Sequence, residues 1–450
     1  MRRVGSILLL LLSSAAVEAA HLDVYPDGSG PYPDLRYALA AAQSGDSIRL
    51  ADGIYTGAGN RNLELGGVLT ILSMNGDPEN CILDLEADGR GFLIRSVLGT
   101  GIRIQGIAFR AGDPRLLPEQ LLQGFGGGLA IWGLSAGGSV IIERCIFEEA
   151  TAEAGGGAFL YEAAATFSGC VFRHNLATDG AGVYAGYCTA GDGVQFAGCL
   201  FHGNGYPYSS VGGYGGGIYY SHSRGAVELC TLTENSAWLG AGLLVSTASD
   251  VRAEGVLIAF SAEGQGLALY SSGEVAIVRC DFFGNAGGDW TGAIAGFLGV
   301  DCNMREDPIF CGQAEADFTV RDDSPCLAEN NGCGQIGAFL QGCTAPGGVD
   351  AGPGLGSGSL QLASPFPMPC HGLATVAFTL PDAGHVRLRL VDAQGRVRAT
   401  LVDGFAAAGA HRIGIGDAAG ARDHGLASGV YQIRLEFAGE TLSRSLVVLR

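Results

Sequence analysis

The sequence contains no lysine, because all 26 of its basic residues are arginine. Chemistry that depends on a lysine amine is therefore excluded, including Schiff-base formation, lysine general-base catalysis and the phosphate-binding lysine of P-loop proteins. Acidic residues number 45, which gives a formal net charge of −19 at pH 7. An acidic surface disfavours nucleic acids and anionic membranes as partners. A polyanionic sugar would need a local arginine cluster or bridging Ca²⁺.

Long hydrophobic runs are also missing beyond the N-terminus, so we expect no transmembrane segment. Within the first twenty residues, Arg2 and Arg3 precede the apolar run Ile7–Leu12, and Val17-Glu18-Ala19 offers a small-residue cleavage site. This order is typical of a secretory signal. We predict a signal peptide over residues 1–19 and an exported mature protein, secreted or held at the cell surface.

A phrase of about 25 residues recurs through the first two thirds of the chain, and a period of this length predicts a solenoid. It begins CIFEEATAEAGGG at Cys145, CVFRHNLATDGAG at Cys170 and CTLTENSAWLGAG at Cys230. Two positions after each start stands a large apolar residue: Phe109, Phe147, Phe172, Phe201, Leu232, Ile258 or Phe282. Five positions after the start of a unit stand Asn175, Asn204, Asn235 and Asn285. Ten positions after the start stand Gly155, Gly180, Gly240 and Gly266.

Each unit holds three short apolar runs rich in Val, Ile, Phe and Tyr, which indicates strands rather than helices. Three strands per turn predict an all-β fold, a right-handed parallel β-helix that rises by about 4.8 Å per turn. The Phe and Cys positions should face the bore, the Asn should form a tight turn, and the Gly should permit the next corner. Asp34 should cap a short helix through about Gln43 that covers the open end.

Thirteen cysteines suit an oxidising compartment. Those in the repeat are spaced by whole turns and are expected to be reduced, although neighbouring members could pair. Cys302, Cys311, Cys326, Cys333 and Cys343 crowd into one loop-rich segment that suggests disulfides. The pairs Cys302–Cys311 and Cys326–Cys333 are our prediction, although sequence does not fix connectivity.

The segments DGSGPYPDLRYAL and SGDSIRLADGIYTG, with the closing run DPIFCGQAEADFTVRDDSPC, resemble secreted right-handed β-helix proteins of the pectate-lyase-like superfamily. The glycine-cluster and FxxN repeats are also similar to those of bacterial polymorphic outer-membrane proteins. The resemblance implies a β-helix over residues 20–343, in a bacterial protein. It specifies an activity hardly at all.

Residues 344–360 are rich in Gly, Pro and Ser and are expected to be a flexible linker. Residues 361–450 then contain alternating strands such as VRLRLVD and YQIRLEF. DAQGRVR and ASGVYQIRL resemble the Ig-like domain of flagellar hook-capping proteins and secretion-sorting domains. This resemblance implies a small Ig-like β-sandwich that serves in attachment or sorting, and a spacer or lid is the alternative.

The catalytic sets of the pectate-lyase-like enzymes are not found intact, so no catalytic residue is assigned. His174 and His202 are interpreted as surface turn residues. Five acids follow the Phe strand and could gather on one edge: Glu148, Glu149, Glu153, Asp179 and Glu234. Such acids could hold Ca²⁺ with Arg173 or Arg110 as base, while solvated surface acids are the alternative. No metal or other cofactor is otherwise expected.

Aromatic residues give the binding candidates, because flat rings with polar tips suit sugars and protein partners alike. The inserted loop GYPYSSVGGYGGGIYYSHS and the strands before it provide them, with ordinary surface or loop packing as the alternative reading. The candidates are Trp132, Tyr184, Tyr206, Tyr208, Tyr214, Tyr219, Tyr220 and His222, with Tyr161 at a similar place.

These observations favour a non-catalytic, exported solenoid, expected to be monomeric, that presents one face to a polysaccharide or a cell-surface component. The alternative is a polysaccharide-active enzyme, in particular a Ca²⁺-assisted lyase. In either case we expect the site where insertions break the repeat, after Phe109 and after Asn204.

Overall fold

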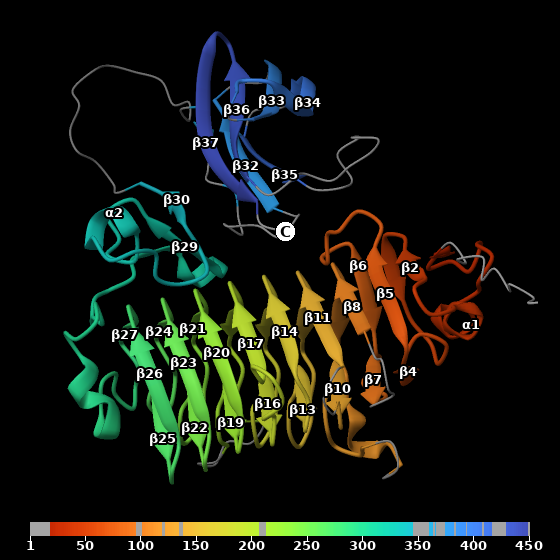
Figure 1. Ribbon diagram of the computed structural model, residues 1–450, viewed down its shortest axis with the longest axis vertical. Coiled ribbons are helices and arrows are strands. Elements are labelled where there is room, and N and C mark those ends of the chain that lie inside the picture. The colour runs from red at the N-terminus through yellow and green to blue at the C-terminus, as the bar shows by residue number, and fades with distance from the viewer. Residues whose placement is uncertain are drawn as a thin grey trace, which may run out of the picture.

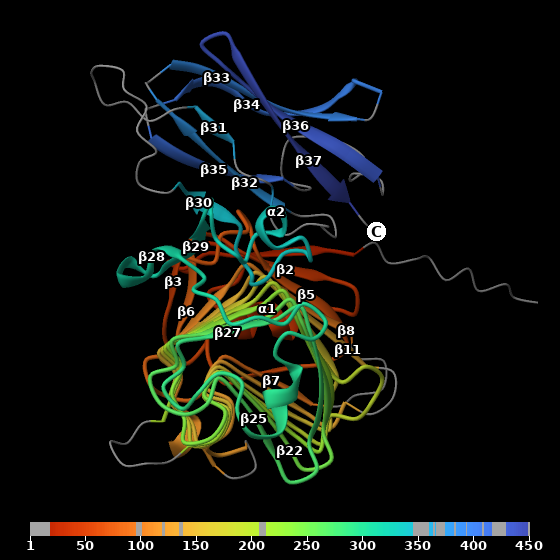
Figure 2. The ribbon, with the colours of Figure 1, turned by 90° about the vertical axis from the view of Figure 1, so that its left-hand side faces the viewer.

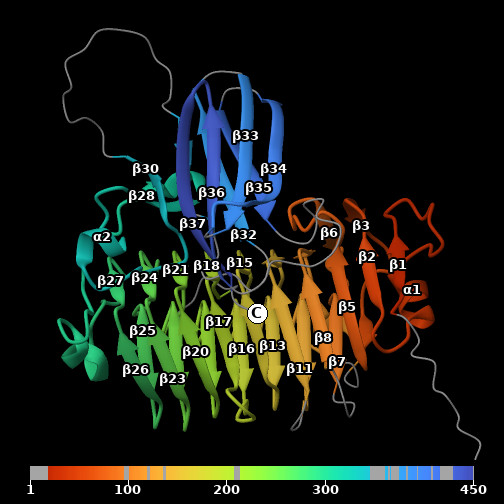
Figure 3. The same ribbon diagram turned by 45° about the horizontal axis from the view of Figure 1, so that its top comes forward.

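The computed structural model shows two β-structured parts, a long solenoid and a group of antiparallel strands near the C-terminus (Figures 1 and 3). Almost all of the expected signal peptide and of the expected linker lies outside the described residues. The described residues are 19–344 except 96–100, 119–121, 135–137 and 207–212, followed by 360–362, 365, 374–381, 384–392, 394–406, 409–415 and 429–448.

The solenoid is a right-handed parallel β-helix, as the repeat predicts. In each full turn the chain passes through a ten-stranded, a nine-stranded and an eight-stranded sheet in that order, for example along β14, β15 and β16. Each of these strands pairs in parallel with its counterpart one turn earlier and one turn later. Seen along the axis, the strands superpose into three walls around one bore (Figure 2).

The ten-stranded sheet contains, in spatial order, β1 (His21–Val24), β2 (Ser47–Leu50), β5 (Val68–Ser73), β8 (Gly101–Gln105), β11 (Ser139–Glu143), β14 (Ala165–Ser168), β17 (Val194–Ala197), β20 (Arg224–Glu228), β23 (Asp250–Glu254) and β26 (Glu274–Val278). The nine-stranded sheet contains β3 (Gly53–Tyr55), β6 (Cys81–Asp84), β9 (Ala108–Arg110), β12 (Ile146–Glu148), β15 (Val171–Arg173), β18 (Leu200–His202), β21 (Thr231–Thr233), β24 (Leu257–Ala259) and β27 (Asp281–Phe283). The eight-stranded sheet contains β4 (Leu63–Leu65), β7 (Phe92–Arg95), β10 (Leu129–Trp132), β13 (Ala158–Tyr161), β16 (Val183–Gly186), β19 (Ile218–Ser221), β22 (Leu243–Ser246) and β25 (Leu267–Tyr270).

The repeated Phe positions fill the bore. Phe147 and Phe172 are in register on β12 and β15, fully buried, with parallel rings whose centroids are 4.8 Å apart. The next pair, Phe172 and Phe201, stacks at 4.7 Å. The repeat cysteines face the same interior and carry free thiols, as expected: Cys81, Cys145, Cys170, Cys199, Cys230 and Cys280.

The repeated asparagines form a buried row that ties successive turns together. The amide nitrogen of Asn204 donates to the Phe172 carbonyl at 2.8 Å and to the side-chain oxygen of Asn235 at 3.0 Å. The left-handed residue of this turn is the one before the asparagine, such as His174 with φ 54°. Glycine is required at Gly180, where φ is 58° and a Cβ would lie 2.4 Å from the Val183 carbonyl oxygen.

A short helix covers the N-terminal end of the solenoid, as predicted. It is α1 (Leu35–Ala41), and the Asp34 side chain caps it by accepting from the Tyr37 amide at 3.2 Å. Leu35 and Ala38 are buried in the same core as the first strands. The opposite end is closed by the short helix η3 (Gly292–Phe297), whose Ile294 joins this core. Another short helix, η1 (Pro114–Leu116), lies in the insertion after Phe109.

The cysteine-rich segment, residues 302–343, folds back over the outside of the nine-stranded sheet. Val320, Cys326 and Leu327 pack against Leu257 and Ala259 of β24. The segment contains the short elements β28 (Phe310–Gly312), η4 (Gln313–Glu315), β29 (Asp317–Arg321), α2 (Ala328–Asn331) and β30 (Gln341–Cys343).

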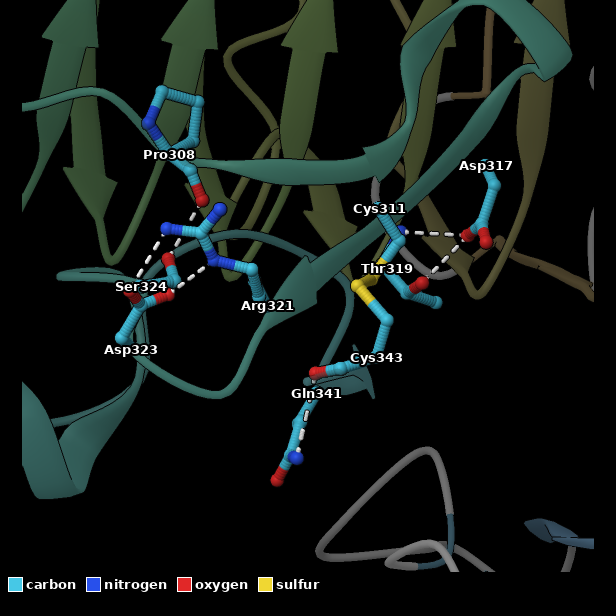
Figure 4. Close-up of a disulfide and its surroundings, with 9 residues drawn as sticks. All are labelled: Pro308, Cys311, Asp317, Thr319, Arg321, Asp323, Ser324, Gln341 and Cys343. Atoms are coloured by element: carbon cyan, nitrogen blue, oxygen red, sulfur yellow. Dashed lines mark hydrogen bonds and ion pairs between the residues drawn. A yellow bond between two sulfur atoms is a disulfide. The ribbon is translucent and has the colours of Figure 1, made fainter. Parts of the chain in front are cut away.

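Two disulfides hold this segment, but both predicted pairings are wrong. Cys302 bonds to Cys333, and Cys311 bonds to Cys343, which joins the two outer strands of the small sheet β28-β29-β30 (Figure 4). Cys326, predicted to be bonded, has a free thiol. It is fully buried and directed at β27, where it donates to the Asp281 carboxylate at 3.6 Å. Sequence spacing did not reveal that this cysteine belongs to the contact with the solenoid.

The C-terminal part consists of two antiparallel sheets around a second hydrophobic core. Alternate residues of β33, such as Val386, Leu388 and Leu390, are buried. The strand pairing alone does not identify an Ig-like β-sandwich, so this assignment stays a prediction. One sheet contains β31 (Gln361–Leu362), β32 (Ala374–Leu380) and β35 (Gly409–Ile415), and the other β34 (Val397–Ala406), β33 (Gly384–Asp392), β36 (Gly429–Phe437) and β37 (Glu440–Val448).

Candidate functional site

The outer surface of the eight-stranded sheet carries the largest group of aromatic side chains. In β13, Ala158 and Leu160 are buried in the bore, so strand alternation directs Phe159 and Tyr161 outward. The same parity places Tyr184 of β16 and Tyr219 of β19 outside, in register with Phe159. The repeat therefore builds a row of outward rings across successive turns.

Two rows of ring contacts cross the sheet from strand to strand. In the first row Phe159 stacks on Tyr184 at 5.3 Å, and Tyr184 meets Tyr219 edge to face at 5.2 Å. This row continues through Tyr214 to Trp238 and starts at Phe125. In the second row Trp132 stacks on Tyr161 at 4.5 Å, Tyr161 contacts Tyr187 at 5.2 Å, and Tyr187 stacks on His222 at 4.4 Å. We call the ten residues of the two rows the aromatic face.

Small residues between the rows let the rings lie against the sheet. A Cβ added to Gly186 would come within 2.7 Å of the Tyr184 ring, so this ring lies across the glycine. Ser246 donates to the Tyr219 hydroxyl at 3.2 Å, and the Ser221 hydroxyl lies 3.3 Å from Nδ1 of His222. The result is an array of stacked and edge-to-face rings with hydroxyl and imidazole groups at its edge, and such amphipathic rings suit sugars and protein partners.

The aromatic face remains accessible at several rings. Tyr187 is 44% exposed and Trp238 is 50% exposed, while Tyr184 and Tyr219 are half-buried. Burial raises the pKa of Tyr184 to about 12, so its hydroxyl stays neutral. Exposed apolar patches often mark interaction sites.

A carboxylate lies beside the rings. Asp179 stands in the turn before β16, and it pairs through its backbone with Ala154 on one side and Tyr214 on the other. Its side chain has no hydrogen bond or ion pair to any described residue. Burial raises the pKa of Asp179 to about 6, and its charge in turn contributes to the raised pKa of Tyr184.

The predicted aromatic candidates divide into three groups. Trp132, Tyr184, Tyr219, Tyr214 and His222 all belong to the aromatic face. Tyr206 is half-buried beside Gly213. Tyr208 lies outside the described residues.

Tyr220 is a correction. It was predicted as a surface residue, yet it is fully buried in the bore, and its hydroxyl donates to the Val194 carbonyl at 2.8 Å. In the run IYYS only one of the two adjacent tyrosines can face outward, and strand parity assigns that place to Tyr219. Conversely, Phe125, Phe159, Tyr187 and Trp238 belong to the face but were not predicted. For Phe159 the available signal was its place fourteen residues after Cys145, which matches that of Tyr184 after Cys170; the other three share no such offset.

The nine-stranded sheet carries a different outer surface, made of charged pairs. Arg110 donates to Asp84 at 2.8 Å, and Arg173 bonds to Glu148 at 2.6 Å and lies 3.2 Å from Glu79. These carboxylates raise the pKa of both arginines, against the effect of desolvation, which for Arg173 is the largest single influence. Neither arginine is poised to lose a proton, so neither suits the role of a lyase base.

His202 also differs from expectation, since it is buried rather than a surface turn residue. Its Nε2 lies 3.1 Å from Glu234, and Gln313 of the cysteine-rich segment donates to the same carboxylate at 2.6 Å. Burial lowers the pKa of His202, although Glu234 opposes this. His174 is exposed, as predicted, and its ring meets that of His202 at 4.8 Å.

The five candidate acids do not form one cluster. Glu148 and Glu234 are engaged on the nine-stranded sheet with Arg173 and His202, whereas Glu153 and Asp179 precede strands of the eight-stranded sheet. Glu149 is exposed. Among the described residues, no three His, Cys, Asp or Glu side chains are grouped so that they could hold a metal ion. Nor does the part of the chain that the structure describes contain a helix long and apolar enough to cross a bilayer.

Comparison with protein-family models supports the β-helix fold. Residues 127–297 match the family model described as "Right handed beta helix region". No curated protein sequence matches significantly. Among solved structures, the enzymatically active domain of tailspike protein 4 from bacteriophage CBA120 is similar at 10% identity and a TM-score of 0.22. The match covers 89% of this chain and 62% of that one, so it spans less than two thirds of the tailspike chain.

Proposed function

We propose that this protein is a non-catalytic, exported solenoid that binds a glycan on its aromatic face. The observation that carries the proposal is the pair of ring rows from Trp132 to His222 and from Phe125 to Trp238. Rings that pack on one another across a rigid sheet provide a preformed surface, which lowers the entropy cost of binding. The C-terminal sheets would serve in attachment to an envelope or export system.

A lyase is less well supported. Its base would come from Arg173 or Arg110, and both guanidinium groups are paired with carboxylates that favour the protonated form. The acids that could hold Ca²⁺ are distributed over two sheets. The aromatic face and these arginines also lie on different walls of the solenoid, since they belong to the eight-stranded and the nine-stranded sheet. A substrate on the rings would not meet them.

The test replaces the two central rings. We expect Tyr184→Ala and Tyr219→Ala each to weaken binding to a retained polysaccharide roughly 3- to 10-fold, since one ring contact is worth about 0.5–1.5 kcal/mol. Binding is measured by affinity electrophoresis against a panel of neutral, N-acetylated, amino and uronic-acid polysaccharides. Tyr270→Ala is the matched control, because Tyr270 is an exposed tyrosine of the same sheet outside the aromatic face.

Two results would contradict the proposal. One is binding that Tyr184→Ala and Tyr219→Ala leave unchanged. The other is turnover of uronic-acid polysaccharides in the presence of Ca²⁺. We expect none, so the absorbance of unsaturated products should stay at the level of the buffer. Product formation that an Arg173→Ala or Arg110→Ala substitution abolishes would establish the lyase instead.

A further inference from the structure

The charges around the aromatic face are mostly of one sign, with Arg95 beside Trp132 as the exception. Its strands and the turns that lead into and out of them, in residues 122–134, 153–163, 178–188, 213–222 and 238–248, contain no arginine, and the chain has no lysine. They do contain three acids, Glu153, Asp179 and Glu162, of which Glu153 and Glu162 are exposed. The nearest arginine of the same sheet is Arg95, paired in register with Trp132, and it lies 4.0 Å from Glu64.

This sign selects among sugars. A uronate or sulfated chain laid on the rings would face Glu153, Asp179 and Glu162 without a cation to pair with, on a protein of net charge −19. Like charges in contact are repulsive, and specificity often comes from such repulsion. A neutral chain could donate hydroxyl hydrogen bonds to the half-buried Asp179 carboxylate but would leave its charge uncompensated. A chain bearing ammonium groups would both neutralise this carboxylate and place cations over the ring faces, where the aromatic quadrupole attracts them.

Asp179 is placed for this role. It stands between two rings of the first row, because its backbone pairs with Tyr214 and its charge acts on the Tyr184 hydroxyl. The other ionisable groups near it are Glu153, whose carbonyl accepts from the Asp179 amide, and the two tyrosines. No described cation faces it. A desolvated carboxylate flanked by aromatic rings is the arrangement that recognises an organic ammonium ion.

The geometry also fits an extended ligand. The two rows cross the strands β10, β13, β16 and β19, and the first row reaches Trp238 in the turn before β22. Neighbouring strands are about 4.8 Å apart, so the rows extend for roughly 20 Å along the solenoid axis. This length accommodates several consecutive sugar rings.

We propose that the aromatic face takes a linear polymer of amino sugars with free amines, lying along the solenoid axis with an ammonium group at Asp179. The inference rests on the proposed glycan-binding function and gives it a substrate class. Ring faces of the sugar contact Tyr184 and Tyr219, and the exposed acids Glu153 and Glu162 attract neighbouring ammonium groups.

The test compares three oligosaccharides that share one β-1,4-linked backbone and differ at a single carbon. Cello-oligomers carry a hydroxyl there, chitin oligomers an acetamide, and chitosan oligomers a free amine. We expect calorimetry with the full chain at pH 7 to give at least tenfold tighter binding of the free-amine oligomer. Asp179→Asn, which keeps the shape of the side chain, should remove most of this preference. Glu274→Gln, an exposed acid on the ten-stranded sheet, should not.

Non-specific attraction of a polycation to an acidic protein is separated by a third variant. Tyr184→Ala keeps every charge, so retained binding of the free-amine oligomer by this variant would overturn the inference. The pH response gives an independent sign. Lowering the pH from 7 to 5 adds charge to the amine but protonates Asp179, whose pKa is about 6. If the ligand binds at this carboxylate, its affinity should be weaker at pH 5 than at pH 7. If amine charge alone attracts it, the affinity should be stronger at pH 5.

The remaining outcomes separate the two proposals. Equal affinity for the three oligomers, with loss in Tyr184→Ala, would overturn the amino-sugar inference and leave glycan binding standing. Tighter binding of a uronic-acid oligomer would do the same. If no oligosaccharide binds, or if binding ignores the rings altogether, both proposals fail.

Discussion

At the scale of the residue, Asn204 shows what a repeated sequence position can and cannot tell. The sequence predicted that asparagine five positions into the unit makes a tight turn with a left-handed backbone. The turn is there, but the left-handed residue is the preceding one, as at His174 and Glu234. The asparagine itself is buried and bonds across turns. A repeat identifies which residues stack, whereas the partner of each amide depends on backbone geometry that the sequence does not contain.

We expect Asn204→Ala to cost about 3 kcal/mol of unfolding free energy, because it leaves the Phe172 carbonyl and the Asn175 amide without these partners in a buried row. Urea denaturation followed by circular dichroism measures the change. Asn80→Ala, which removes an exposed asparagine bonded to Asp77, is the matched control and should change the free energy by about 0.5 kcal/mol or less. A loss in Asn204→Ala no larger than in this control would show that the buried row is dispensable.

At the scale of the element, the aromatic face was predictable only in part. The outward parity of Tyr184 and Tyr219 follows from strand alternation, and both were among the binding candidates named from the sequence. Tyr220 was misplaced because two adjacent tyrosines cannot be ordered without the register of the strand. Tyr187 and Trp238 were missed because they lie in turns, whose orientation has no fixed period. The disulfide pairs of the cysteine-rich segment failed for the same reason.

Docking of the cysteine-rich segment should depend on pH through Asp281. This carboxyl is fully buried between β27 and the segment, where it accepts from the Glu306 amide at 3.0 Å and from the Cys326 thiol. Burial raises the pKa of Asp281 to about 7 from its ordinary value of 3.8, and the nearby Glu306 and Asp289 add to the increase. The folded state therefore favours the protonated form. Its stabilising contribution is complete below the ordinary value and is lost as the pH rises through about 7.

We expect the melting temperature of the wild type to fall, relative to that of Asp281→Asn, as the pH is raised from 4 to 8. The change corresponds to a few kcal/mol, since one pKa unit is worth about 1.4 kcal/mol. Calorimetry of both proteins across this range measures it. His202, whose pKa is lowered, titrates in both proteins and so cancels from the difference. A constant difference across the range would contradict the prediction.

At the scale of the whole molecule, the sequence predicted nearly all of the solenoid, because each of its positions recurs and is read several times. The stacked Phe positions, the free repeat cysteines and the capping helix from Asp34 were all predicted. The parts that occur once, such as the route of residues 302–343 over the nine-stranded sheet, were not. Because each turn contacts only the turns next to it, the stability of the solenoid should be a sum of contributions from single turns and from neighbouring pairs of turns.

Interaction energies should therefore decay within one or two turns. In a double-mutant cycle, Phe147→Leu and Phe172→Leu should couple by about 0.5–1.5 kcal/mol, because their rings stack directly. Phe147→Leu and Phe282→Leu, on strands about 24 Å apart, should add to within about 0.5 kcal/mol. Urea denaturation of the single and double variants provides the energies. Equal coupling energies for the near and the distant pair would contradict the prediction that interaction energies are restricted to neighbouring turns.

The row of free thiols has a consequence for the order of assembly. Cys145, Cys170, Cys199 and Cys230 stand directly above one another in successive turns, at a separation that would permit disulfide bonds. Yet each is enclosed by the turns on either side, and burial raises the pKa of Cys145, Cys170 and Cys199, which suppresses the reactive thiolate. All four precede Cys302 in the chain. In a medium oxidising enough to form the bond between Cys311 and Cys343, winding from the N-terminus would bury these four thiols before the later cysteines become available to pair with them.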